Sequence, residues 1–483
     1  MTQSHSSEWW QHQQTRRSFV NNAGIGFGAA ALTGLLASEG AAEPLAAGAL
    51  NQGQAGFPNI PPRVKRVIFL CMAGGPSHLE TFDEKPVLAK MDGQPMPDSY
   101  TAGQPIAQLQ GQTLRCQGPM VRFRKCGQSG LSISDFLPWH QKMADDLCVL
   151  RSMVTEQINH DPAHTFMNTG TAISGRPSMG SWVTYGLGSD SQDLPGFVVM
   201  TSVGGRNPQP IASRQWGAGF LPSRFQGVEF SSTGSPVHYL ESPPGVSTDQ
   251  QRMLITSINA LNRHRNQVLH SSELETRMAA YEMAFRMQMS VPDLMDMSDE
   301  PQHVLDMYGA VPGDGSFASN CLLARRLAER GVRFIHLYHR GWDHHGDLVR
   351  YMNVCCGLTD RATWALIQDL KQRGMLEDTL VIWGGEFGRT PMFQGKGGPG
   401  RDHHIKGFSM WMAGGGLRGG TAYGNTDELG YNSVENIVHV RDLHATMLHM
   451  LGINPTRFSV RHQGLDMKLT GVEESRVLHE LLS

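Results

Sequence analysis

The chain runs Val332-Arg333-Phe334-Ile335-His336-Leu337-Tyr338 in its C-terminal half. This stretch is mostly apolar and of strand length, so it predicts a buried β-strand. A helix is predicted before it, over Cys321 to Arg330, with Gly331 as its C-cap. A second helix and a second strand are predicted over Asp360 to Arg373 and Leu380 to Trp383. Strands that alternate with helices of this length imply right-handed crossovers and a parallel sheet.

Acidic and histidine side chains gather just after these strands. The clusters are Trp342-Asp343-His344-His345, Glu386-Phe387-Gly388-Arg389 and, on a Gly-rich loop further on, Arg401-Asp402-His403-His404. Parallel crossovers place the first two clusters at one edge of the sheet, where open α/β sheets bind ligands. Because Asp, Glu and neutral His are common ligands of zinc and manganese, we expect a metal site at this edge.

A central strand is also predicted at Val67 to Met72, where a continuous apolar run ends at a Gly-Gly-Pro turn. Residues 46–63, rich in Pro and Gly, are expected to form a linker, and residues 64–483 a single domain. Within it, about 190–300 is expected to be an insertion, loop-rich at first and helical from Thr248 to about Met289.

The N-terminal segment predicts export rather than folded structure. Thr15-Arg16-Arg17-Ser18-Phe19-Val20 places a twin arginine before a mildly apolar stretch, Ala23 to Ser38. This stretch is too short and too weakly apolar for a membrane span, so we expect no transmembrane span in the mature chain. Residues 1–45 are expected to be a twin-arginine signal recognised by the twin-arginine export machinery, and the protein to be periplasmic or otherwise exported.

Composition predicts a globular protein of balanced charge. Of the 483 residues, 18% are charged and the net charge is −3, so no basic field favours nucleic acid as a partner. The seven cysteines contain no CxxC pair, which excludes a zinc ribbon. Cys116 and Cys126 flank a short loop and are candidates to pair in an oxidising compartment.

A helix is predicted to begin at Asp442, with that residue as its cap, and to end at Gly452. His444 in its first turn has two interpretations, a hydrogen-bonded structural residue or a site residue.

Taken together, these motifs resemble the exported bacterial family catalogued as domain of unknown function 1501, in the alkaline phosphatase and sulfatase superfamily. Besides the clusters, the matching text includes Gly75-Pro76-Ser77-His78, Gly219-Phe220-Leu221-Pro222-Ser223, Leu323-Ala324-Arg325-Arg326-Leu327 and Asp442-Leu443-His444-Ala445-Thr446. The resemblance implies a three-layer α/β/α sandwich with a mostly parallel central sheet and metal ligands on loops at one sheet edge.

The resemblance also implies particular metal ligands. Asp343 and His345 resemble an acid and histidine pair of one site, Glu386 stands where superfamily hydrolases have an Asp ligand, and Asp402 with His403 supplies a further ligand. The expected cofactor is a divalent metal, namely zinc, manganese, calcium or magnesium. The alternative is a structural network of salt bridges, although burying so many acid and His side chains without a metal is costly.

The chain departs from sulfatases at the nucleophile. No Cys-x-Pro/Ala-x-Arg segment occurs. When residues 160–164 are aligned with such a segment, His160 takes the place of the nucleophile and His164 that of the arginine. Three interpretations stay open. His160 is an extra ligand of a metal that activates water; Thr165 or Ser77 is the hydroxyl nucleophile; or the site binds without catalysing.

Two further residues have paired interpretations. Arg389 either clamps the oxyanion of an ester, as phosphate and sulfate sites require, or forms a salt bridge that orients Glu386. His78, with Asp83, belongs either to a site loop after the first strand or to a capped turn.

The sequence therefore predicts an exported metal-dependent hydrolase of phosphate or sulfate esters, lacking a formylglycine-type nucleophile. The expected substrate is a small-molecule or polysaccharide ester, with His160 and Arg389 as catalytic residues and His78 and His164 as weaker candidates. The alternative is a non-catalytic exported binding protein that retains a metal or anion pocket.

Overall fold

A computed structural model describes residues 52–205, 209–234, 236–237, 247–269, 272–395 and 397–483. The chain divides into two compact units. Within the described residues, the larger unit comprises Gln52–Ser191, Pro195–Pro236 and Leu294–Ser483, and the smaller one Gln192–Leu194 and Val237–Asp293. The predicted export signal, residues 1–45, and the first part of the predicted linker lie outside the described residues.

A mixed sheet forms the centre of the larger unit, with the strand order β14-β4-β13-β8-β1-β7-β5-β6. The strands are β1 (Arg66–Met72), β4 (Cys148–Val154), β5 (Phe197–Thr201), β6 (Val228–Phe230), β7 (Phe334–His339), β8 (Thr379–Gly384), β13 (Phe408–Ala413) and β14 (Thr421–Tyr423), with β17 (Val438–His439) beside β4. Every pairing is parallel except the two that β13 makes. The prediction of a mostly parallel α/β sheet is confirmed.

Short two-stranded ribbons surround this sheet. They pair β2 (Phe123–Cys126) with β3 (Leu131–Ser134), β9 (Gly388–Arg389) with β12 (His403–His404), β10 (Gln394–Gly395) with β11 (Pro399–Gly400), β15 (Asn425–Thr426) with β16 (Ser433–Glu435) and β18 (Val460–His462) with β19 (Leu465–Met467).

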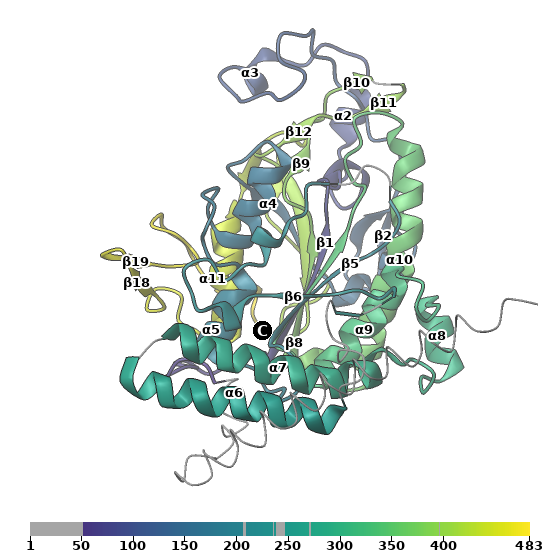
Figure 1. The fold of residues 1–483 in the computed structure, drawn as a ribbon. Coiled ribbons are helices and arrows are strands. Elements are labelled where there is room, and N and C mark those ends of the chain that lie inside the picture. Colours follow the sequence, from purple (N-terminus) through teal and green to yellow (C-terminus); the bar gives the residue numbers. More distant parts are fainter. Residues whose placement is uncertain (1–51, 206–208, 235, 238–246, 270–271, 396) are drawn as a thin grey trace, which may run out of the picture. The chain divides into compact units, whose positions relative to one another are not determined.

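Helices cover both faces of the sheet, which gives three layers (Figure 1). One layer contains α4 (His160–Thr169), α5 (Met179–Leu187) and α11 (Val440–Met450); the other contains α8 (Gln302–Tyr308), α9 (Phe317–Glu329) and α10 (Leu348–Gln372). Of two short helices, α2 (Pro86–Lys90) lies near the β10–β11 ribbon, and α3 (Asp98–Thr101) follows it in the chain. The core lies between the sheet and its helices, with Phe69 and Val199 of the sheet and Trp182 and Leu443 of the helices all buried.

The three central strands end level with one another. In the parallel register of β1 with β7 and β8, Cys71 stands opposite both Tyr338 and Gly384. Their following loops therefore emerge at one edge of the sheet, as the alternation of helices and strands predicts.

Three helices begin earlier than the sequence pattern predicts, and of these α9 starts at Phe317 rather than Cys321, after the cap Ser316. Helix α10 starts at Leu348 rather than Asp360, because Met352, Cys355 and Thr359 continue its buried face toward the N-terminus. Helix α11 starts at Val440, and its cap is His439 rather than Asp442. Asp442 is instead the third helical residue of a capping box, in which its carboxylate accepts the His439 backbone N–H at 3.0 Å.

The described part of the predicted linker is bonded to the larger unit. The Gln54 N–H donates to the carbonyls of Tyr185 and Gly186, and Asn59 N–H to that of Gly452.

All seven cysteines are free and buried. Cys116 Sγ lies 3.6 Å from Met96 Sδ, and Cys126 Sγ lies 3.3 Å from the Arg124 carbonyl. The two thiols proposed to pair from their spacing are therefore not joined, since each packs against a different neighbour.

The smaller unit contains the helical part of the predicted insertion. Helix α6 spans Thr248–Leu269, and α7 spans Ser272–Met295, with Pro292 inside it. Arg286 Nη1 donates to the Gln192 carbonyl at 3.0 Å, which fastens α7 to the segment Gln192–Leu194. Among the residues that the structure describes, no helix is both long and apolar enough to cross a membrane.

Candidate metal centre

Three loops bring the chemistry-bearing side chains together at one sheet edge. Asp343 follows β7, Glu386 follows β8, and His160 begins α4, a few residues after β4 ends. His160 and His164 lie four residues apart and so share one face of α4. The sheet topology, rather than any local motif, makes these residues neighbours.

Four side chains converge most closely, and they are His160, Asp343, His345 and His403. The Oδ1 atom of Asp343 lies 3.2, 2.9 and 3.2 Å from the Nε2 atoms of His160, His345 and His403 respectively. The Nε2 atoms of His345 and His403 lie only 2.9 Å apart. The structure thus brings together three of the predicted metal ligands and adds His160 to them.

In two of these rings, the hydrogen bond made by the Nδ1 atom determines which ring nitrogen carries the proton. His403 Nδ1 lies 2.8 Å from the Ile158 carbonyl, and His345 Nδ1 lies 2.5 Å from Gln394 Oε1. Carbonyl oxygens only accept hydrogen bonds, so each Nδ1 carries the proton. In a neutral ring the Nε2 atom then has a lone pair, and the two lone pairs face each other.

The third ring has the same arrangement. His160 Nδ1 lies 2.6 Å from Glu386 Oε1, a carboxylate that accepts its proton. Burial lowers the His160 pKa, but the carboxylates of Asp343 and Glu386 raise it more, so the pKa is above its ordinary value. Three Nε2 atoms therefore surround one carboxylate oxygen, an arrangement that either a metal cation or a proton on a ring stabilises.

These residues fit a bound transition metal. In a tetrahedral zinc site with bonds of about 2.0–2.1 Å, the ligand atoms lie about 3.3 Å from one another. Four of the six separations between these donor atoms are 2.9–3.2 Å, close to that value, and all of the donor atoms lie within 4.8 Å of one another. In known metal sites, a histidine ligand usually donates the N–H of its other ring nitrogen to a carbonyl or carboxylate oxygen, as these Nδ1 atoms do.

Glu386 supports His160 and lies beside, not within, the group of four. It is completely buried, and its two oxygens accept the Gly74 N–H at 3.0 and 3.1 Å. Burial alone raises its pKa, but the nearby His164 and His160 lower the pKa to about 2. Glu386 is thus a carboxylate behind a histidine, and with His160 and His164 it also forms a second group of suitable spacing.

His164 is the least satisfied side chain of the site. It is fully buried, neither ring nitrogen has a hydrogen-bond partner within the part of the chain that the structure describes, and its Nε2 lies 3.3 Å from Glu386 Oε1. Burial lowers its pKa. Neutral and held beside a carboxylate, it is the candidate for a ligand of a second cation.

Asp402 positions the loop of His403. Its carboxylate accepts the backbone N–H groups of Leu109 and His403, each at 2.8 Å. Its Oδ1 lies 4.0 Å from His345 Nδ1, on the side away from the converging Nε2 atoms. Of the predicted pair, His403 therefore joins the cluster and Asp402 supports it.

Arg389 is buried and its guanidinium is fully engaged. Its Nη2 lies 2.7 Å from Asp343 Oδ1, and its Nε and Nη1 donate to the carbonyls of Gly75 and Arg401 at 2.9 and 3.2 Å. The salt bridge given as one interpretation of this residue is present, but Asp343 replaces Glu386 as the partner. Arg389 also contributes to holding the pKa of Asp343 well below its ordinary value, although burial opposes this.

The remaining candidates have local structural partners. His78 Nε2 lies 2.9 Å from the Gly430 carbonyl, and Asp83 pairs with Lys85 at 2.9 Å. His444 Nε2 lies 2.7 Å from the Met167 carbonyl, which matches the structural interpretation of that residue.

The two hydroxyl candidates also have hydrogen-bond partners that lie nearby in the sequence. Thr165 Oγ1 donates to the Asp161 carbonyl at 2.9 Å, within α4, and Ser77 Oγ donates to Glu80.

Two glutamines were not identified from the sequence. Gln394 orients His345, and its Nε2 lies 3.3 Å from Oε1 of Gln108, whose own Nε2 lies 3.2 Å from His345 Nε2. The only available signal was the position of Gln394 between the second and third clusters.

Solved structures similar to this chain are distant. A lipoteichoic acid synthase from Listeria monocytogenes is 10% identical, over 86% of this chain and 79% of its own, with a TM-score of 0.34. A sulfatase from a Pseudoalteromonas species is 13% identical over 81% and 68%, with a TM-score of 0.32. The alkaline phosphatase of the Antarctic bacterium TAB5 is 11% identical over 82% and 99%, with a TM-score of 0.29. Similarity at this level says nothing about activity.

A comparison with curated proteins gives no match. A family model, in contrast, matches residues 64–482, almost the whole domain that the sequence predicts. The chain belongs to the family described as Protein of unknown function (DUF1501).

Proposed function

We propose that this protein is an exported metal-dependent hydrolase of phosphate or sulfate esters. The observation that carries the proposal is the convergence of three histidine Nε2 atoms on Oδ1 of Asp343, with each Nδ1 atom hydrogen-bonded elsewhere. Such a site is preorganised for a metal ion, because all three Nε2 atoms point to one place.

The donor set favours zinc or manganese over calcium or magnesium. Three imidazole nitrogens and one carboxylate oxygen suit transition metals, whereas calcium and magnesium are bound mainly by oxygen atoms. His160, Asp343, His345 and His403 would hold the ion. A bound divalent cation supplies Lewis acidity, which polarises the ester oxygen and lowers the pKa of water.

The protein side chains set the protonation and position of these ligands. Glu386 holds the Nδ1 proton of His160, which favours the ligand interpretation of His160 over a nucleophilic one. Arg389 holds the Asp343 carboxylate, so it acts on the reaction through a ligand rather than by touching the ester. With Ser77 and Thr165 engaged locally, water is the proposed nucleophile.

The second candidate function is binding without turnover. The four side chains at the centre are only 5–16% exposed, so an ester has little access to the donor atoms. Limited access of this kind favours a protein that retains its metal and binds an anion without hydrolysing it.

Elemental analysis and ester assays of the full-length protein test both functions. We expect stoichiometric zinc or manganese, with turnover of aryl phosphate, phosphodiester or aryl sulfate that disappears with chelator and returns with metal. Asp343→Asn should lose the metal, whereas Asp249→Asn, a matched change at an exposed position of α6, should retain it. Metal without turnover of any ester favours the binding function, and absence of metal contradicts both.

A further inference from the structure

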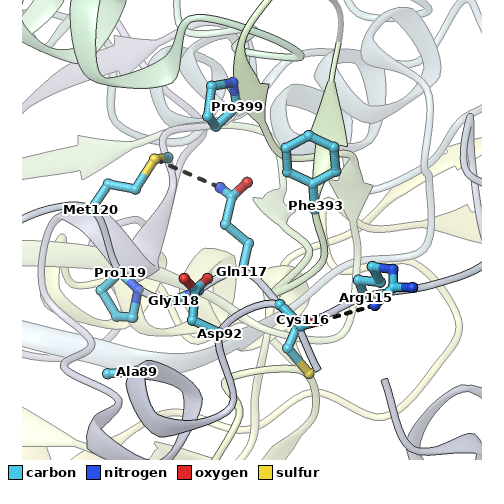
Figure 2. Close-up of a pocket in the computed structure, with 11 residues that line it drawn as sticks. Ala89, Asp92, Arg115, Cys116, Gln117, Gly118, Pro119, Met120, Phe393 and Pro399 are labelled. Atoms are coloured by element: carbon cyan, nitrogen blue, oxygen red, sulfur yellow. Dashed lines mark hydrogen bonds between the residues drawn. The ribbon is translucent and has the colours of Figure 1, made fainter. Parts of the chain in front are cut away.

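A separate cavity of about 500 Å³ lies in the larger unit, a size typical of small-molecule sites. Figure 2 shows the side chains that line it. They include Asp92, Arg115, Gln117, Met120, Phe393 and Pro399.

The cavity and the metal centre lie on opposite faces of the β10–β11 hairpin. Gln394 of β10 contacts His345, while its neighbour Phe393 lines the cavity. In β11, Gly400 lies against the His345 backbone so closely that a side chain would not fit, while its neighbour Pro399 lines the cavity. Because successive strand residues point to opposite faces, the hairpin forms a wall shared by both sites.

Gln117 is the polar residue that indicates a ligand site in this cavity. The residue is 4% exposed; among the described residues its Oε1 has no hydrogen-bond partner, and its Nε2 has only the Met120 sulfur at 3.9 Å, a weak acceptor. The residue is held firmly, since its N–H donates to the Pro391 carbonyl at 2.8 Å and its carbonyl accepts from Arg401 at 3.1 Å. The backbone of Gln117 is therefore fixed, and its carboxamide lines the cavity with one acceptor oxygen and one donor nitrogen.

The surrounding walls are apolar, and the rim is charged. Phe393 is 46% exposed and offers a flat face, while Met120 and Pro119 form a further apolar wall. Asp92 and Arg115 are exposed and place opposite charges at the rim. A ligand that fits has an amide for Gln117, a small apolar group beside it, a flat apolar face for Phe393 and hydroxyl groups for the rim.

We propose that this cavity binds an N-acetylated amino sugar. The acetamide N–H and C=O pair with Oε1 and Nε2 of Gln117, its methyl group packs against Met120, and the C–H face of the sugar ring packs on Phe393. The volume leaves room for more than one sugar ring. The site needs no metal, so it stands independently of the proposed hydrolysis.

Three trimers that differ only at C2 of each sugar ring test the proposal. They are triacetylchitotriose, its fully deacetylated form and cellotriose, titrated into the full-length protein by calorimetry. We expect triacetylchitotriose to bind at least tenfold more tightly than the other two, with and without chelator. Persistence of binding in the Asp343→Asn protein separates this site from the metal centre, so that either proposal can fail alone.

Two variants tie the binding to the cavity. Gln117→Leu keeps the volume and removes the amide, and Phe393→Ala removes a half-exposed side chain at little cost to folding; each should weaken triacetylchitotriose binding at least tenfold. Asp249→Asn should bind as the wild type does. No binding of triacetylchitotriose, equal binding of the three trimers, or unchanged affinity in both cavity variants overturns the proposal.

Discussion

The carboxylate of Glu386 accepts the Nδ1 proton of His160 at 2.6 Å, from a position that solvent does not reach. A carboxylate behind a histidine fixes the ring orientation and increases the basicity of its other nitrogen, which here is the atom that faces Asp343. We therefore propose that Glu386 supports His160 as a ligand, whereas the sequence predicts Glu386 as a direct ligand.

Glu386→Gln should weaken metal binding by about tenfold, because an amide oxygen still accepts from Nδ1 but polarises the ring less. Glu386→Ala should weaken it more, since it also leaves the Gly74 N–H without its partner. Competition with a chromophoric chelator measures both affinities. If Glu386 is a direct ligand, the two variants should lose metal as completely as Asp343→Asn does.

Gln394→Leu should lower metal affinity about 10- to 100-fold, because His345 then has no acceptor for its Nδ1 proton. Gln394→Glu should restore much of that affinity, since a carboxylate accepts the same proton. The same chelator competition measures the effect, and the pair of variants separates orientation of His345 from simple loss of volume. Equal affinities for the leucine variant and the wild type would show that packing alone orients the ring.

Arg389→Lys should destabilise the metal-free protein by about 3–5 kcal/mol, because a buried carboxylate and several carbonyls lose a partner that an ammonium group cannot replace. Urea unfolding monitored by circular dichroism measures the change. Arg457→Lys, at an exposed position after α11, is the matched control and should be neutral. A loss below about 1 kcal/mol would contradict the engaged state of the guanidinium.

Much of the fold follows from sequence pattern because its central strands are buried on both faces. The runs at β1, β7 and β8 are continuous and apolar, and the predicted ends lie within two residues of those observed. The start of α10 was missed, since its first turns depend on tertiary burial of Met352 and Cys355 rather than on a cap with a side-chain hydrogen bond.

The candidate site was predictable only where its side chains follow strands. Asp343 and His345 stand at such ends, but the distinction between Glu386 as a ligand and as a support depends on side-chain directions that no spacing reveals. Gln394 and Gln108 reach His345 from loops, and a lone glutamine in a loop has no sequence signature of that role.

The proposed export signal predicts that the location of the protein in the cell depends on its paired arginines. A double change, Arg16→Lys with Arg17→Lys, should leave most of the protein in the cytoplasm, because the proposed twin-arginine signal depends on this pair. Cell fractionation followed by immunoblotting of the full-length chain measures the distribution, and Arg457→Lys serves as the control. Undiminished export of the double variant would contradict a twin-arginine route.

Acid should destabilise the protein through buried neutral histidines. Burial lowers the pKa values of His444 and His339 to about 4, although for His444 the Met167 carbonyl opposes part of the shift. In the unfolded chain each ring titrates near its ordinary value of about 6.5, so between these values the unfolded state binds more protons and stability falls as the pH falls. Each ring should reduce the free energy of unfolding by about 2 kcal/mol between pH 7 and pH 5.

His444→Gln retains a donor for the Met167 carbonyl and should remove its share of that loss, as measured by urea unfolding of the metal-free protein at both pH values. His264→Gln, exposed on α6, should leave the pH dependence unchanged, and a His444→Gln protein as acid-sensitive as the wild type would show that this ring is protonated in the folded state.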